Sequence, residues 1–102
     1  MNIITRRTLL FYIKQFPLAA NSLLIWYKDF SNSDFKNFNE LKAVYNNASI
    51  VANNRVIFNI KGNSFRLIIS MNFKKQAAYI IWFGTHLDYN KIDAATIVYT
   101  KV

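Results

Sequence analysis

The spacing of apolar residues changes near the middle of the chain. Before Asn46 they recur every three or four positions, as on one face of a helix, and afterwards they recur mainly at every second position. Helices followed by strands predict an α+β fold, with the helices packed on a mainly antiparallel sheet. The length of 102 residues indicates a single domain, residues 1–102, with one core.

The N-terminal part predicts a short strand followed by two helices. Asn2 to Ile4 is the strand, and Thr5 is expected to cap a helix that runs to about Phe16, where Pro17 ends it. A second helix is predicted over Ala19 to Phe30, and so short a link should make the pair an antiparallel hairpin. The positions expected to face the core are Leu9, Ile13 and Phe16, then Ala20, Leu23, Leu24, Tyr27 and Phe30.

Two further elements flank the central part of the sequence. Asn37 and Glu40 have the spacing of a capping box, which predicts a third helix through Val44 or Tyr45. After the break at Asn46, strands are expected, and the last of them runs from Gln76 to Phe83. The seven-residue apolar run inside this strand predicts that it is buried.

The stretch from Arg55 to Asn72 predicts a β-hairpin. Gly62-Asn63 lies between two β-rich runs and is typical of a two-residue turn, so Lys61 should pair with Ser64. The register then gives the apolar pairs Ile60–Phe65, Phe58–Leu67 and Val56–Ile69, and on the other face Asn59–Arg66 and Arg55–Ser70, with Ile57 and Ile68 between them. We therefore expect one apolar face for helices and one open, basic face.

Positive charge is the strongest feature of the composition. Thirteen Lys and Arg oppose five Asp and Glu, which gives a formal net charge of +8. No acidic residue occurs from Leu41 to Leu87, where the basic residues are Lys42, Arg55, Lys61, Arg66, Lys74 and Lys75. Such a field attracts polyanions, so nucleic acid is the favoured partner. A membrane surface is less favoured, because no predicted helix is long, basic and amphipathic.

Several classes of site and location are excluded or disfavoured. The chain has no cysteine and one histidine, so disulfides, thiolate zinc sites and histidine-rich metal sites are excluded, and we expect no cofactor. The longest apolar runs are far shorter than the roughly 18 residues of a membrane span. The N-terminus does not resemble a signal peptide, because Lys14 interrupts its short apolar run. We expect a cytoplasmic protein.

The turn after the last strand carries the candidate chemistry. Residues 84–93 hold the only histidine, His86, together with Tyr89 and Lys91, where side chains can face a ligand on a rigid scaffold. An imidazole, a phenol and an ammonium can together transfer protons and neutralise negative charge. The structural alternative is that His86 caps a turn and Tyr89 fills the core.

Two sequence blocks resemble the HigB family of bacterial toxins. They are Asn53 to Leu67, which is similar to the hairpin of that family, and Gly84 to Asp93, which is similar to its C-terminal signature. Residues 3–9 and Trp26-Tyr27-Lys28 match as well. The resemblance implies a small RelE-like α+β domain that cleaves mRNA, usually on the ribosome. It also implies inhibition by a helix-turn-helix antitoxin of the HigA type, encoded beside the toxin.

The resemblance also assigns residues. Arg66 matches a phosphate-binding arginine, and His86, Tyr89 and Lys91 match the histidine, tyrosine and lysine of the C-terminal signature. Ile81 departs from the pattern, because the family commonly has an arginine there; the resemblance leaves open whether Lys74 or Lys75 substitutes for it. The residues assigned to catalysis are His86, Arg66, Tyr89 and Lys91, and those assigned to RNA binding are Arg55, Asn59, Lys61, Lys74 and Lys75.

The implied reaction is attack by a 2′-hydroxyl on the adjacent phosphorus, which needs no metal. Arg66 suits charge neutralisation, because a guanidinium binds two phosphate oxygens, and His86 suits proton transfer as either base or acid. Tyr89 suits stacking on a base or a hydrogen bond to phosphate. Two alternatives stay open: a non-catalytic RNA- or DNA-binding module, and a degenerate toxin that only binds partners.

Overall fold

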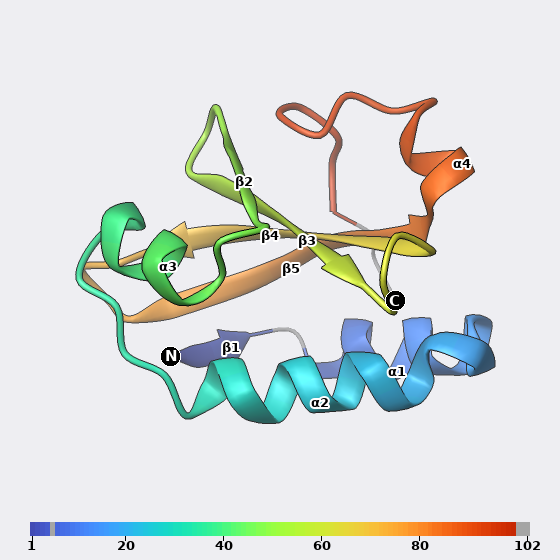
Figure 1. The fold of residues 1–102 in the computed structure, drawn as a ribbon, viewed down its shortest axis with the longest axis horizontal. Coiled ribbons are helices and arrows are strands. Elements are labelled where there is room, and N and C mark those ends of the chain that lie inside the picture. Colours follow the sequence, from blue (N-terminus) through green and yellow to red (C-terminus); the bar gives the residue numbers. More distant parts are fainter. Residues whose placement is uncertain (5, 100–102) are drawn as a thin grey trace.

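The computed structural model describes residues 1–4 and 6–99, and within them the fold is α+β (Figure 1). Its sheet has five strands in the order β1-β5-β4-β3-β2. The short β1 pairs with β5 in parallel, and the other neighbours are antiparallel, as predicted. The strands are β1 (Asn2–Ile4), β2 (Ser49–Val51), β3 (Arg55–Ile60), β4 (Phe65–Asn72) and β5 (Ala77–Thr85).

The helices lie mainly on one side of this sheet (Figure 1). They are α1 (Arg6–Gln15), the 3-10 turn η1 (Pro17–Ala19), α2 (Ala20–Ser31), α3 (Phe38–Val44) and the short α4 (His86–Tyr89). The predicted cap Thr5 lies outside the described residues. The helical hairpin is confirmed, but α1 and the η1–α2 stretch are bent by 115°, so they cross obliquely instead of running antiparallel.

The third helix begins as its sequence predicts. The Asn37 side chain accepts a hydrogen bond from the Glu40 backbone N–H at 2.9 Å, which satisfies a free donor of the first turn. The Glu40 carboxylate accepts from the N–H of Lys36 instead of Asn37, so only half of a capping box forms. No single helix in the described part of the chain is long and apolar enough to cross a membrane; α1 with η1–α2 meets that test only as a bent pair.

The hairpin register is confirmed from Arg55–Ser70 to Ile60–Phe65, whereas Lys61 and Ser64 lie in the turn and not in the ladder. Ile60 lies opposite Phe65, Phe58 opposite Leu67, and Asn59 opposite Arg66. The N–H of Ser64 donates to the carbonyl of Lys61 at 3.2 Å and closes the turn. Gly62 has φ +63° at the first central position, which is the conformation that favours glycine there.

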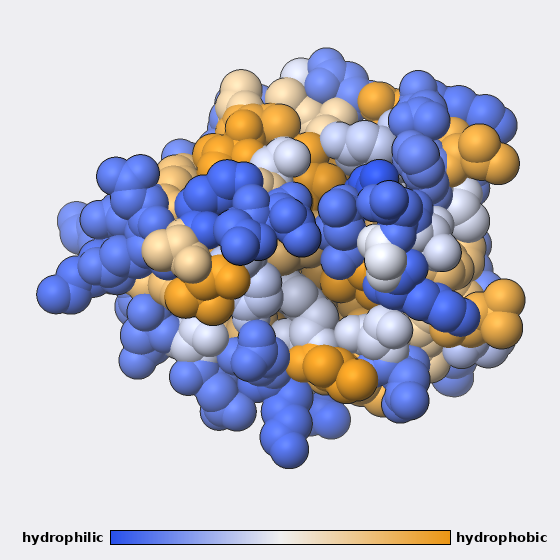
Figure 2. Space-filling model, in the orientation of Figure 1, coloured by the Kyte–Doolittle hydropathy of each residue, from blue (hydrophilic) through white to orange (hydrophobic). Residues whose placement is uncertain are grey.

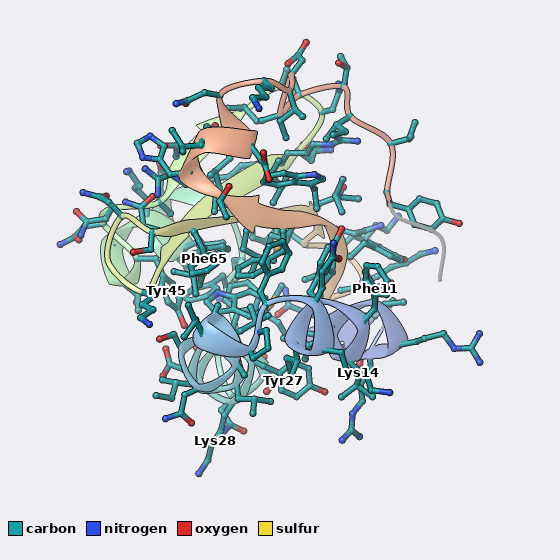
Figure 3. The ribbon with its side chains drawn as sticks, turned by 90° about the vertical axis from the view of Figure 1, so that its right-hand side faces the viewer. Phe11, Lys14, Tyr27, Lys28, Tyr45 and Phe65 are labelled. Carbon is teal, nitrogen blue, oxygen red and sulfur yellow. The ribbon has the colours of Figure 1, made fainter. Side chains whose placement is uncertain are left out.

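The face toward the helices is closed by an aromatic core. Phe58 on β3 contacts the rings of Trp26, Phe30 and Tyr45, at centroid distances of 5.2 to 5.5 Å. Phe65 stacks on Phe83, and Figure 3 shows Phe65 directed into the space between the sheet and the helices. The predicted stripe of the second helix was partly wrong, because Leu24 is exposed and Trp26 is buried in its place.

The opposite face is not open along its whole length, which corrects the sequence-based expectation. Ile57, Ile68 and Ile81 form a second buried cluster there, and the C-terminal segment, residues 90–99, contributes Ala94 and the partly buried Ile97. Ile81 is the extra residue of a β-bulge, because Ile68 pairs with Trp82 and Ile69 with Ile80. Alternation alone could not predict this cover, which comes from a segment without regular structure.

Candidate functional site

The site lies where β4 begins and β5 ends. Arg66 is directly opposite Gly84 in the antiparallel pair, two residues before His86. The backbone N–H of His86 donates to the carbonyl of Ser64 at 3.0 Å, which fixes the start of α4 beside the first residues of β4. The sheet therefore brings Arg66 close to His86 and Tyr89, although Arg66 lies 20 or more positions before them in the sequence.

Arg66 lies over the aromatic ring of Tyr89. Its guanidinium carbon is 5.9 Å from the ring centroid, within the range of a cation–π contact. One of its nitrogens, Nη1, also donates to the carbonyls of Asn63 and Phe65, both at 3.1 Å. Its other nitrogens make no hydrogen bond to protein groups within residues 1–4 and 6–99, so an oriented guanidinium edge remains for an anion.

Trp82 packs beside Tyr89 and against Gly84, and the sequence analysis did not assign it to the site. Its ring centroid is 6.3 Å from that of Tyr89. A Cβ added at Gly84 would lie 2.6 Å from Cη2 and 2.7 Å from Cζ2 of Trp82, so the indole lies directly on the glycine backbone. The glycine is required here by close approach, and the only signal in the sequence was an aromatic residue two positions before Gly84.

Thr85 starts the turn that presents His86. Its Oγ1 accepts a hydrogen bond from the N–H of Asp88 at 3.1 Å and caps the single-turn helix α4. His86 is therefore the first residue of α4, and its side chain is exposed. The imidazole is accessible to a substrate, and the structural alternative that it caps a turn does not describe it, since Thr85 has that role.

Tyr89 and Lys91 have different surroundings. Tyr89 is half-buried between Trp82 and Arg66, so it has both a packing role and an accessible edge. Lys91 is exposed and forms an ion pair with Asp88 at 3.9 Å. Such an exposed pair contributes little to stability, so it leaves the ammonium free to meet a phosphate.

Two residues assigned to RNA binding are engaged elsewhere. The expectation that Arg55 lies on an open face is wrong, because its Nη1 donates to the carbonyls of Ala94 at 2.9 Å and Ile97 at 2.7 Å. Lys61 is exposed, but its Nζ donates to the carbonyl of Leu18 in η1 at 3.2 Å. Lys61 therefore extends toward the helices, whereas its assignment to RNA binding had placed it beside Arg66 on the basic face.

The remaining predicted cations lie far from the site. Lys74 and Lys75 are in the β4–β5 turn, beyond Asn72 at the end of β4, which is itself six residues, or about 20 Å at the rise of a strand, from Arg66. Whether they replace an arginine at position 81 stays a prediction, and Ile81 itself is buried. Asn59 is exposed beside Arg66 on the neighbouring strand, so its assignment to RNA binding stays a prediction.

Comparison with known proteins decides the family. The profile of the HigB toxins, described as the RelE-like toxic component of a toxin–antitoxin system, matches residues 19–92. The chain belongs to the HigB toxin family. The match includes the hairpin, Arg66, His86, Tyr89 and Lys91, and membership implies an antitoxin partner. No curated protein matches this HigB-family chain significantly.

Proposed function

We propose that this HigB-family chain is an endoribonuclease toxin that cleaves mRNA by attack of a 2′-hydroxyl on the adjacent phosphorus. The observation that supports this most is the meeting of Arg66, Tyr89 and the start of α4 at one end of the sheet. This end carries an oriented cation, an aromatic ring and an exposed imidazole on a toxin scaffold.

The chemistry assigns a role to each group. The 2′-oxygen forms a bond to phosphorus, and the bond from phosphorus to the 5′-oxygen breaks. One proton leaves the 2′-hydroxyl and one reaches the departing 5′-oxygen, and His86 carries out one of these transfers. Arg66 neutralises the charge of the pentacoordinate phosphate. Tyr89 and the carbonyl of Asn63 hold the Arg66 guanidinium in position. The products carry a 2′,3′-cyclic phosphate and a 5′-hydroxyl.

The cellular setting follows from this reaction. The substrate is mRNA, cleaved on the ribosome in the cytoplasm, and the net charge of +8 favours capture of that polyanion. The antitoxin required by the family is of the helix-turn-helix, HigA type. Lys91 contributes charge at the site, whereas Arg55 has a structural role.

Cleavage of mRNA in a purified translation system tests the proposal. We expect cuts in ribosome-bound mRNA that leave 5′-hydroxyl ends on the downstream fragments, as attack by the 2′-hydroxyl requires. Induced expression should stop growth. Intact mRNA under all of these conditions, with folded protein present, would contradict the proposal.

A binding-only protein is the second candidate, and Ile81 is the observation that favours it. This buried residue occupies the position where the family resemblance expects an arginine, so the site has one cation fewer than that pattern. Retained RNA affinity without cleavage by the wild type would select this candidate.

A further inference from the structure

A cavity of about 400 Å³ lies beside an uncovered edge of the sheet, next to Arg66 but outside the site described above. β2 pairs only with Arg55 to Ile57, so among the residues that the structure describes no strand covers the outer edge of β3 from Phe58 to Ile60. The loop after α3 and the tip of the β3–β4 hairpin form the walls of the cavity. The lining residues include Asn46, Asn47, Phe58, Asn59 and Asn63.

Four side-chain amides give this cavity its chemistry. Asn46, Asn47, Asn59 and Asn63 are all exposed, and within residues 1–4 and 6–99 their side chains make no hydrogen bond to protein groups. Other asparagines are used structurally: Asn37 caps α3 and Asn53 donates to the carbonyl of Ala95. The four cavity amides are therefore available to a ligand that both donates and accepts hydrogen bonds.

The charge of the lining restricts the ligand further. No acidic residue lines the cavity, and none occurs from Leu41 to Leu87. Figure 2 shows hydrophilic side chains on both sides of a hollow in the middle of the visible face. A volume of this size lies within the range of small-molecule sites, and amides pair well with the edges of nucleobases.

Two residues that line the cavity are neighbours of Arg66, which does not itself belong to the lining. Asn59 is the cross-strand partner of Arg66, and adjacent strands lie about 4.8 Å apart. Asn63 also lines the cavity, and its backbone carbonyl accepts a hydrogen bond from Nη1 of Arg66 at 3.1 Å. An RNA phosphate bound to Arg66 would therefore have a neighbouring nucleoside within reach of these two lining residues.

We propose that this cavity is a base-binding subsite, which holds one nucleobase of a single-stranded RNA whose phosphate lies on Arg66. The inference rests on the proposed function, which identifies the bound polymer as RNA. It adds a cavity that distinguishes among the bases of that RNA. Arg66 contributes affinity that depends on salt, and the asparagines contribute the preference among bases.

Binding of uncleavable oligonucleotides tests this subsite separately from catalysis. Fluorescence anisotropy would compare 2′-deoxy hexamers of each single base, which lack the attacking hydroxyl, at several salt concentrations. The proteins are the wild type, the double variant Asn47→Ala with Asn59→Ala, Arg66→Ala, and Asn21→Ala as an exposed control on α2. The side-chain amide NMR signals of the wild type, titrated with the best hexamer, give a second readout that needs no variant.

The wild type should prefer one base over another by about fivefold or more, the range for one good amide–base contact. The double variant should reduce this preference to within about twofold and leave the salt dependence unchanged. Arg66→Ala should lower the salt slope by about 0.7 and keep the order of bases, and Asn21→Ala should match the wild type.

Three results would overturn the subsite: no preference in the wild type, an unchanged preference in the folded double variant, or cavity amide signals that do not move with bound hexamer. Cleavage that continues with any of these results would leave the ribonuclease proposal standing. A base preference that depends on the asparagines, without cleavage of RNA, would keep the subsite and remove the nuclease.

Discussion

The two faces of the sheet are closed by different means. Toward the helices, 21 buried residues form one cluster in which aromatic rings contact one another, and its members come from helices and strands alike. On the other face, four buried residues form a small cluster under the C-terminal segment. The first face can therefore hold the fold by apolar burial alone, whereas the second depends on polar bonds to a segment without regular structure.

This difference separates stability from function. The helix-side face holds β4 and β5 in place, while the other face presents Arg66 and Tyr89 at the end that the C-terminal segment leaves accessible. Substitutions on the helix-side face should therefore lower the free energy of global unfolding. Substitutions on the other face should first reduce the local order of the site.

The largest effect is expected at Phe58 on the helix-side face. Phe58→Ala removes a 3% exposed ring that contacts Trp26, Phe30 and Tyr45. The free energy of unfolding should fall by about 3 to 5 kcal/mol, measured by chemical denaturation. Leu18→Ala, at a 78% exposed position, is the control and should change it by about 0.5 kcal/mol or less. Equal losses in the two variants would remove the contrast between core and surface.

Arg55 tests how the second face is closed. Arg55→Ala removes two hydrogen bonds to the carbonyls of Ala94 and Ile97, and leaves part of the cluster uncovered. We expect a loss of about 2 to 3 kcal/mol, since bonds with a charged donor contribute more than neutral ones. Hydrogen exchange should show that amides of residues 95–97 lose protection while those of β3 keep it.

The matched control for Arg55 is Lys75→Ala, which removes an equal charge from an exposed turn. It should leave both stability and exchange unchanged. If Arg55→Ala also leaves the protection of residues 95–97 intact, the guanidinium does not hold the C-terminal segment.

Sequence reasoning succeeded where one periodic pattern determined the result. The hairpin register followed from Gly62-Asn63 and the alternation of apolar residues, because a shift by one position would have placed Phe58 in solvent. The oblique crossing of α1 and α2 and the burial of Trp26 depend on packing between elements, which spacing within one helix does not specify.

The candidate site shows the same limit. His86 and Arg66 could be chosen from residue type and resemblance, and the register then placed them together. The bulge at Ile81 and the bonds of Arg55 could not be predicted, because both arise from contacts with residues far along the chain. Lys74 and Lys75 were assigned from charge alone, which carries no information about the distance to Arg66.

Gly84 tests the contact that supports the site. Gly84→Ala should force the Trp82 indole to move, at a cost of about 1 to 3 kcal/mol by denaturation, with a change in the packing of Tyr89. In a Trp82→Ala background the same change should cost much less, because the obstructing ring is absent. Additive losses in this double-mutant cycle would contradict the close approach.

A smaller effect with a defined pH dependence is expected at Tyr45. Burial, followed by the hydrogen bond that its hydroxyl donates to Asp29, raises the pKa of the Tyr45 phenol well above its usual value. Because the folded pKa exceeds the unfolded value of about 10, this stabilisation is present below pH 10 and is lost as the pH rises further. Tyr45→Phe should cost about 1 kcal/mol at pH 7 and remove this part of the alkaline loss. An unchanged alkaline slope would assign the loss to other groups.

The most direct test compares the two ends of the β4–β5 pair. Initial rates of mRNA cleavage, together with RNA affinity, would be measured for the wild type, His86→Ala at one end and Lys75→Ala at the other. The account predicts that His86→Ala lowers the rate by about 10²- to 10⁴-fold while RNA affinity stays within about twofold, and that Lys75→Ala preserves the rate. Cleavage by His86→Ala within a few-fold of the wild type would contradict the assignment of the site.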